Sequence, residues 1–251
     1  MTYIPTTGKE VGLLRVRFNN RLQHPRELSA FRGAIVKLVG RELDHYHNHD
    51  NREATPEDQE MTSAAEEKRK KVFHRYPLIQ YSIEPLPDGG LRPVMIALAD
   101  GNGQLRKLLL GEAWDIKVNG RPMTVDPAEI TLHKHHFGLV DGWRSYRLTT
   151  WLGFNKENHQ KFGQLRSLGA RVGFIEHTIT SHLMAVASGI GWQVEDRIRV
   201  ELTDFWREYR RPYKGVQMAA FDLAFRTNVA LPLGIGLGKG TAVGYGRLGR
   251  G

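Results

Sequence analysis

The spacing of apolar residues changes in a fixed order along the first half of the chain. Residues 12–20, GLLRVRFNN, alternate apolar and polar side chains as a half-buried strand does, whereas Leu28, Phe31 and Ile35 recur at the spacing of one helical face. The pattern continues as strand, helix, strand, strand, helix and strand, at residues 12–20, 24–42, 77–86, 92–99, 103–112 and 113–118. This order, β-α-β-β-α-β, is that of the ferredoxin-like fold.

A second, similar set of segments begins near Trp143. Its members are a strand, a long amphipathic helix and two strands, at residues 145–154, 172–190, 198–206 and 218–233. The sequence therefore predicts an α+β chain made of two tandem ferredoxin-like (RRM-like) domains with a glycine-rich loop at the C-terminus.

We expect one domain to cover residues 1–141 and the other residues 142–251, with the junction somewhere in residues 120–142. The last strand of the first domain is expected at residues 113–118, directly before the turn residues Asn119-Gly120. Residues 51–71 are highly charged and poor in apolar side chains, so they are predicted to form a solvated loop or short helix.

Composition narrows the functional classes. The chain has 251 residues, a net charge of +9 and no cysteine. The positive charge favours polyanionic partners, nucleic acid first and anionic membrane second. The absence of cysteine excludes disulfides, a thiol nucleophile and thiolate zinc sites. The start of the chain lacks a signal-peptide pattern, and no apolar run is long enough to span a membrane. We therefore expect a cytoplasmic protein without a membrane partner.

Eight of the last eighteen residues, GIGLGKGTAVGYGRLGRG, are glycine. The stretch is not a Walker loop, because Gly238-Lys239 is followed by glycine, and it is not a dinucleotide-binding turn, because no helix can follow. Apolar residues interleave with the glycines, which favours a supported loop over a frayed terminus. From Leu223 onward there are four basic residues and no acidic ones, so a ligand of this loop would be an anion.

A histidine run, DHYHNHD at residues 44–50, is the first candidate for chemistry. HNH nucleases disperse their named residues through a ββα-metal fold, so the contiguous letters are a poor match to them. Alternating imidazoles could bind zinc or nickel, or could be solvated side chains with no role. The remaining interpretation is general acid/base catalysis, which suits a side chain whose ordinary pKa lies near neutrality.

Two basic segments are candidates for contacts with phosphate. One is the run 133–136, His-Lys-His-His, which a loop between domains would resemble equally well. The other is residues 197–215, with six basic and three acidic residues and four interleaved aromatic residues. Nucleobases can stack on such rings while the cations hold phosphates, but a strand hairpin with a solvated basic face has the same composition.

Three stretches together resemble the CRISPR-associated endoribonucleases of the RAMP superfamily, which cut repeat RNA into guide units. They are NVALPLGIGLGKGTAVGYGRL, the pair FRGAIVKLVG and YHNH, and HRYPLIQYSI, with Lys214-Gly215 at the opening of the final hairpin. The resemblance implies two ferredoxin-like domains in tandem. It also implies metal-independent cleavage without a cofactor, in which the ribose 2′-hydroxyl attacks the adjacent phosphate and leaves a 2′,3′-cyclic phosphate.

The resemblance also assigns residues and partners. It places the catalytic acid or base at His47 or His49, with His45 less favoured. It places RNA binding in the hairpin and the glycine-rich loop, at Lys214, Arg210, Arg211, Gly236, Gly238, Lys239, Gly240, Gly244, Tyr245, Gly246 and Arg247. The expected partner is CRISPR repeat RNA or precursor crRNA, with other CRISPR effector subunits or a second copy of the chain as further partners. A non-cleaving RAMP subunit that holds guide RNA and a general RNA-binding module are the alternatives.

Overall fold

The computed structural model describes residues 7–39, 49–50, 73–74, 76–111 and 114–251. Its strands are β1 Thr7–Phe18, β2 His49–Asp50, β3 Phe73–His74, β4 Ile79–Pro85, β5 Leu91–Leu98, β6 Asp115–Val118, β7 Arg121–Thr124, β8 Pro127–Trp151, β9 Val200–Tyr213, β10 Val216–Ala230 and β11 Arg247–Arg250. Its helices are α1 Glu27–Val39, α3 Gly101–Leu109, α4 Lys156–Gln164, α5 Leu168–Ile190 and the 3₁₀ turn η2 Thr241–Val243.

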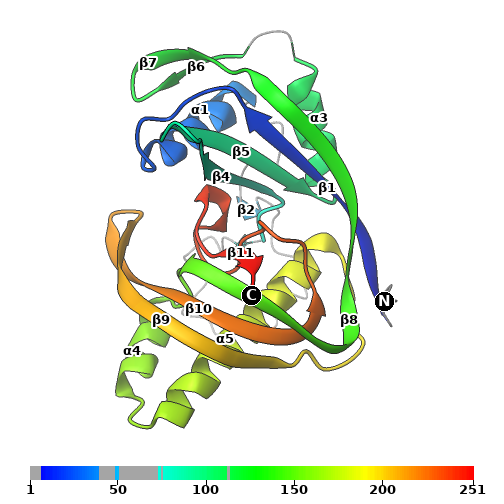
Figure 1. Ribbon diagram of the computed structural model, residues 1–251, viewed down its shortest axis with the longest axis vertical. Helices are drawn as coiled ribbons and strands as arrows, with labels where there is room; N and C mark the ends of the chain where they lie inside the picture. The colour runs from blue at the N-terminus through cyan, green and yellow to red at the C-terminus, as the bar shows by residue number, and fades with distance from the viewer. Residues whose placement is uncertain (1–6, 40–48, 51–72, 75, 112–113) are drawn as a thin grey trace, which may run out of the picture.

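Seven strands form one antiparallel sheet, and β8 runs through both halves of it. The order is β4-β5-β1-β8-β10-β9, with β11 paired to β8 as well. Residues 127–139 of β8 pair with β1, residues 138–139 and 144–151 pair with β10, and residues 146–149 pair with β11. Figure 1 shows the strand crossing from the upper set of strands to the lower set.

Each half of the sheet has the strand order of a ferredoxin-like domain. In the first half β4, β5, β1 and β8 stand side by side, and in the second half β9, β10, β8 and β11 do. Numbered within each half, both orders are 2-3-1-4. The predicted class of two tandem ferredoxin-like domains is thereby confirmed. In the second half the glycine-rich loop takes the place of the helix between the third and fourth strands.

The junction between the halves is a strand. Asp141 and Gly142, where the sequence places the domain boundary, lie inside β8. Gly142 has a φ of 94° and stands between the residues that pair with β1 and those that pair with β11. A left-handed glycine allows one strand to turn from the first half of the sheet into the second without a loop. The division at residue 141 stays a proposal.

The position predicted for the closing strand of the first half, at residues 113–118, is wrong. Residues 115–118 form β6, which pairs only with β7 in a separate two-stranded sheet. The reason is local, because Asn119 and Gly120 adopt φ values of 52° and 81° and reverse the chain after four residues. The first half of β8 provides the closing strand in its place.

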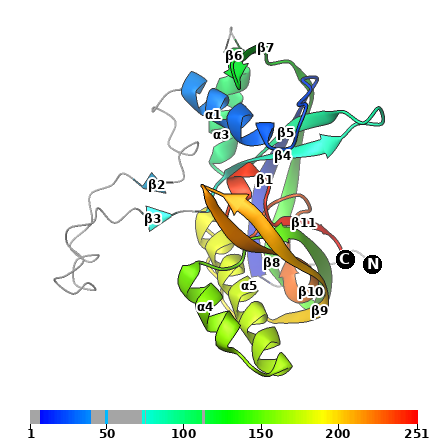
Figure 2. The same ribbon diagram turned by 90° about the vertical axis from the view of Figure 1, so that its left-hand side faces the viewer.

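The helices cover the outer faces of the two halves, as Figures 1 and 2 show. One core lies between α1, α3 and the first half of the sheet, around Phe18, Phe31 and Tyr81. The larger core lies between α5, the second half of the sheet and the glycine-rich loop, and it also takes in residues of β1 and β5; it includes Trp151, Leu237 and Ile96. The prediction of a supported loop is confirmed by this packing. Within the described ranges, no helix has both the length and the apolar character needed to cross a membrane.

A neutral histidine is built into this larger core. His182 of α5 accepts a hydrogen bond at Nδ1 from Trp151 Nε1 at 3.3 Å, and the two rings are 5.6 Å apart. Burial, together with the nearby charge of Lys239, lowers the pKa of His182 to about 4. Because the unfolded chain binds this proton near pH 6.5 and the folded chain does not, stability falls as the pH drops from 6.5 towards 4.

We predict that His182→Gln, which keeps an acceptor for Trp151, flattens this pH dependence. Between pH 7 and pH 5 the wild type should lose about 2 kcal/mol more unfolding free energy than the variant. Urea unfolding at both pH values measures the difference. His177, an exposed residue on the same helix, gives the matched control His177→Gln. Equal losses in His182→Gln and the wild type would contradict the assignment of the proton to this site.

Candidate RNA interface

The glycine-rich loop is bound to the first domain by a buried polar chain. Gln80 of β4 is fully buried; its Oε1 accepts a hydrogen bond from the Gly236 amide at 2.8 Å, and its Nε2 donates to the Tyr76 hydroxyl at 2.8 Å. Tyr76 in turn donates to the Gly236 carbonyl at 3.0 Å. Burial raises the pKa of Tyr76, so this hydroxyl keeps its proton and remains a donor. The segment η2 also packs against α1 and β4.

The glycines of the loop are needed because the chain packs tightly against itself and its neighbours. A Cβ on Gly246 would collide with the carbonyl oxygen of Leu237, and a Cβ on Gly238 would lie 2.8 Å from Trp151 Nε1. Gly246 has a φ of 62°. Both positions therefore exclude side chains for reasons of packing alone.

Several amides in this loop already have acceptors within the protein. Those of Gly236, Gly244 and Gly246 donate to Gln80 Oε1, Thr241 O and Thr150 O. These three amides are therefore not free to donate to a phosphate. The predicted role of five loop glycines in RNA binding stays a prediction, and it rests on the shape of the loop. These glycines are Gly236, Gly238, Gly240, Gly244 and Gly246.

The tip of the β9–β10 hairpin meets the glycine-rich loop. Lys214, at the turn with a φ of 49°, is exposed, and its ammonium lies 5.8 Å from the centre of the Tyr213 ring. Tyr213 and Tyr245 make an edge contact at 5.7 Å, and the Tyr245 hydroxyl donates to the Pro212 carbonyl at 2.9 Å. Two residues predicted from separate segments, Lys214 and Tyr245, are thus brought together.

Arginines and aromatic rings alternate on the face of the second half of the sheet that α5 does not cover. The Arg147 guanidinium lies 4.7 Å from the exposed Trp206 ring, and those of Arg207 and Arg211 lie 4.7 and 5.0 Å from the Tyr209 ring. Such rings offer a base a stacking surface beside a cation. We call this set the arginine–aromatic face.

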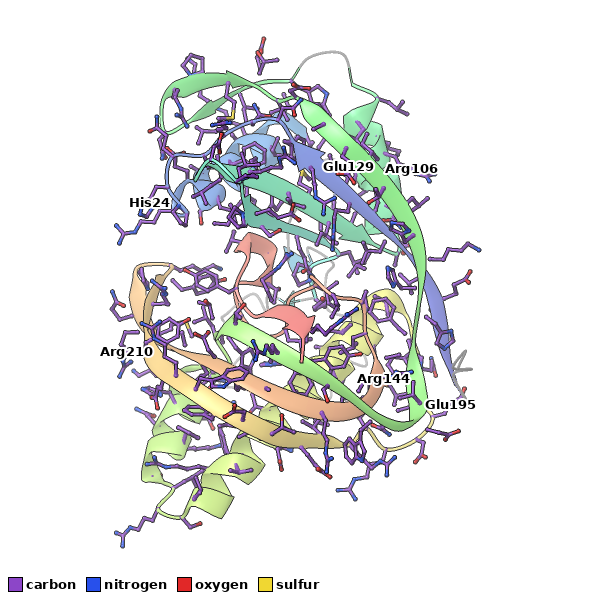
Figure 3. All side chains as sticks on the ribbon, in the orientation of Figure 1. His24, Arg106, Glu129, Arg144, Glu195 and Arg210 are labelled. Atoms are coloured by element: carbon purple, nitrogen blue, oxygen red, sulfur yellow. The ribbon has the colours of Figure 1, made fainter. Side chains whose placement is uncertain are left out.

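Arg210 lies apart from the arginine–aromatic face. As the neighbour of Arg211 on one strand it points to the opposite side of the sheet, although both residues are exposed. Figure 3 shows Arg210 towards the hairpin end of the sheet and Arg144 near the bend of β8.

The two remaining cations of the loop lie apart from each other. Lys239 is exposed beside His182 of α5, and its amide donates to the Leu152 carbonyl at 3.0 Å. Arg247 starts β11 and is partly buried near Arg15 of β1. Arg15 was not among the predicted site residues. The sequence feature that could have indicated Arg15 is the segment LLRVRF, in which two arginines lie on one face of a strand.

Only part of the histidine run can be placed. His45 and His47 lie outside the described residues, and His49 is in β2, where its backbone pairs with His74 of β3. The second basic run, residues 133–136, belongs to β8 and pairs with β1, so it is a strand and not a loop between domains. Burial lowers the pKa of His135. No group of three or more potential metal ligands occurs among the described residues.

Comparison with known proteins agrees with this architecture. Residues 138–250 match the family model of the Cas6b C-terminal domain. A protein of Methanocaldococcus jannaschii, described as uncharacterized, is 21% identical over 111 residues, which are 44% of this chain and 74% of that protein.

Two solved structures share the whole fold. A crystal structure of Cas6b has a TM-score of 0.74 at 20% identity, and one of the CRISPR RNA processing endoribonuclease Cas6b has a TM-score of 0.64 at 18% identity. Each alignment covers 97% of this chain and 100% of the other. These likenesses show that the chain has the fold of the two Cas6b structures. The match over residues 138–250 and the shared fold agree with the family that the sequence resembles.

Gly246→Ala tests the packing role of the loop. The added Cβ meets the Leu237 carbonyl in a left-handed conformation, so we expect a loss of at least about 2 kcal/mol in unfolding free energy. Gly173→Ala in α5, where no atom lies within 4 Å, is the control and should be neutral or stabilising. Chemical denaturation measures both. A Gly246→Ala protein of unchanged stability would refute the packing argument.

Proposed function

We propose that this chain binds CRISPR repeat RNA and cleaves precursor transcripts into guide RNAs. The observation that carries the proposal is that the glycine-rich loop contacts both the tip of the β9–β10 hairpin and helix α1, in a fold like that of the Cas6b structures. The glycine-rich loop contacts the cationic hairpin tip through Tyr245, and η2 rests on α1, the helix that precedes the histidine run in the chain. A net charge of +9 and the arginine–aromatic face supply the attraction for RNA.

Cleavage would proceed by attack of the ribose 2′-hydroxyl on the adjacent phosphate. The P–O5′ bond breaks as the 2′-oxygen bond forms, which leaves a 2′,3′-cyclic phosphate and a 5′-hydroxyl. One group must take the proton of the 2′-hydroxyl and another must protonate the leaving oxygen. We assign one of these tasks to His47 or His49, with His45 as the weaker candidate. Cations such as Lys214 would stabilise the added charge on the phosphate.

The first experiment asks whether the protein cuts repeat RNA in EDTA. We expect one discrete cut, with a product that carries the cyclic phosphate, because the nucleophile belongs to the RNA. Electrophoresis and mass spectrometry of the product measure this. Activity that is abolished by EDTA and restored only by manganese or zinc would contradict the mechanism. Binding without any cut would favour the non-cleaving RAMP subunit, and binding without preference for a repeat would favour a general RNA-binding module.

Alanine at His47 and at His49 tests the catalytic assignment. One of the two variants should slow single-turnover cleavage by about a hundredfold or more while RNA affinity changes little, because a neutral imidazole adds little to phosphate binding. His24→Ala, at an exposed site before α1, is the control and should leave the rate unchanged. A 2′-deoxy nucleotide at the cut site should bind and remain whole. Wild-type rates in both variants would move the assignment to Tyr46, Lys214 or the 133–136 run.

We also propose that the chain acts in the cytoplasm and that it associates with other CRISPR effector subunits or with a second copy of itself. Size-exclusion chromatography with light scattering, with and without repeat RNA, distinguishes a monomer from a dimer.

A further inference from the structure

Two arginines from different domains converge beside Gly234. Arg15 comes from β1 and Arg247 from β11. A Cβ built on Gly234 would lie 2.7 Å from Arg15 Nη2 and 3.3 Å from Arg247 Nη2. Gly234 has a φ of 90°, which favours glycine, and a side chain there would press against both guanidinium groups. The two like charges therefore share one small space between the two halves of the protein.

Both guanidinium groups hold buried N–H donors without acceptors. Arg15 Nε and Arg247 Nη1 are buried and have no hydrogen-bond partner among the described residues. The hydrogen bond of Arg15 is from Nη2 to the Leu233 carbonyl at 3.3 Å. A buried charged donor without an acceptor is costly, and two adjacent ones are costlier because they repel each other. An anion bound between the two guanidinium groups would accept from these donors and offset the repulsion.

The acidic groups on this face are already engaged by another arginine. Glu84 of β4 accepts from Arg17 Nε at 2.7 Å, and Glu129 of β8 accepts from Arg17 Nη1 at 2.9 Å. Glu84 is near enough to raise the pKa of Arg247, but burial and the charge of Arg15 outweigh it and lower that pKa to about 10. Among the described residues, Arg17 is thus neutralised, whereas neither Arg15 nor Arg247 has an ion pair with a carboxylate.

We propose that Arg15 and Arg247 together bind one phosphate group of the RNA backbone, so that the RNA bridges the two domains. A phosphodiester carries one charge over two free oxygens, and each oxygen can accept from one guanidinium fork. The inference rests on the proposed function in taking RNA as the source of the phosphate. The chemistry of the site itself, two guanidinium groups beside a glycine, is independent of whether the RNA is cut.

The shared phosphate predicts a specific pattern in RNA binding. Arg15→Met and Arg247→Met should each weaken binding of repeat RNA by about tenfold and lower the slope of log affinity against log salt by about 0.7, the value for one single-strand phosphate. The double variant should lose little more than either single one, because both side chains hold the same phosphate. Arg21→Met, which removes an exposed arginine paired with Asp88, is the control and should retain the wild-type slope.

A second measurement probes the site without RNA. Inorganic phosphate, at ionic strength matched with chloride, should raise the Tm of the wild type and of Arg21→Met, and should raise it less in Arg15→Met and Arg247→Met. Arg247→Lys keeps the charge without the fork, so it should recover part of the RNA affinity and part of the phosphate effect. Circular dichroism verifies that each variant is folded.

The possible results of these experiments distinguish a failure of the phosphate site from a failure of the proposed function. Additive losses in the double variant, or unchanged salt slopes, would overturn the shared RNA phosphate. A phosphate effect on Tm with unchanged RNA slopes would mean that the site takes free phosphate, which overturns the RNA assignment. The binding arm uses repeat RNA with a 2′-deoxy nucleotide at the cut site, so its result does not depend on cleavage. If wild-type RNA binds with the predicted pattern but is never cut, the site stands and the endoribonuclease proposal fails.

Discussion

The backbone pairing of β8 is the constraint on which the rest of the structure depends. One strand of 25 residues pairs with β1 in its first part and with β10 and β11 in its second part. The two ferredoxin-like halves are therefore held by continuous hydrogen bonding and not by a flexible linker. Because β1 and β11 both pair with β8, the position of Arg247 in β11 is fixed relative to Arg15 in β1. A site that needs side chains from both halves becomes possible because their separation is set by the sheet.

The glycine-rich loop uses this frame to connect distant parts of the chain. Its fixed points are the amide of Gly236 on Gln80, the amide of Gly246 on Thr150 and the contact of Tyr245 with Tyr213. The glycines permit close packing, and the loop is stiff because its amides and carbonyls are bound within the protein. A stiff loop can hold a charged ligand in place without first losing conformational entropy, which favours recognition of an extended anion such as RNA.

Charge is distributed over this frame in two different ways. On the arginine–aromatic face, cations such as Arg147 and Arg211 lie over exposed rings and remain open to solvent. Salt therefore screens them, and in the proposed function they would attract RNA from a distance without great specificity. Arg15 and Arg247 are partly buried, with donors removed from water, so the proposed phosphate would be held there by directed hydrogen bonds. In this proposal the first arrangement captures RNA, and the second fixes its position on the protein.

The sequence by itself determined the two ferredoxin-like domains and most of the element order, because apolar periodicity and glycine spacing are local properties of the chain. It also identified Lys214 and Tyr245, whose residue types stand out in their segments. It misplaced the closing strand at 113–118, because pairing partners of a strand are not encoded in its own alternation. Arg15 appeared only as a polar residue of a half-buried strand. Tertiary structure alone decided that it meets Arg247, since their approach depends on the register of β8 with β1 and β11.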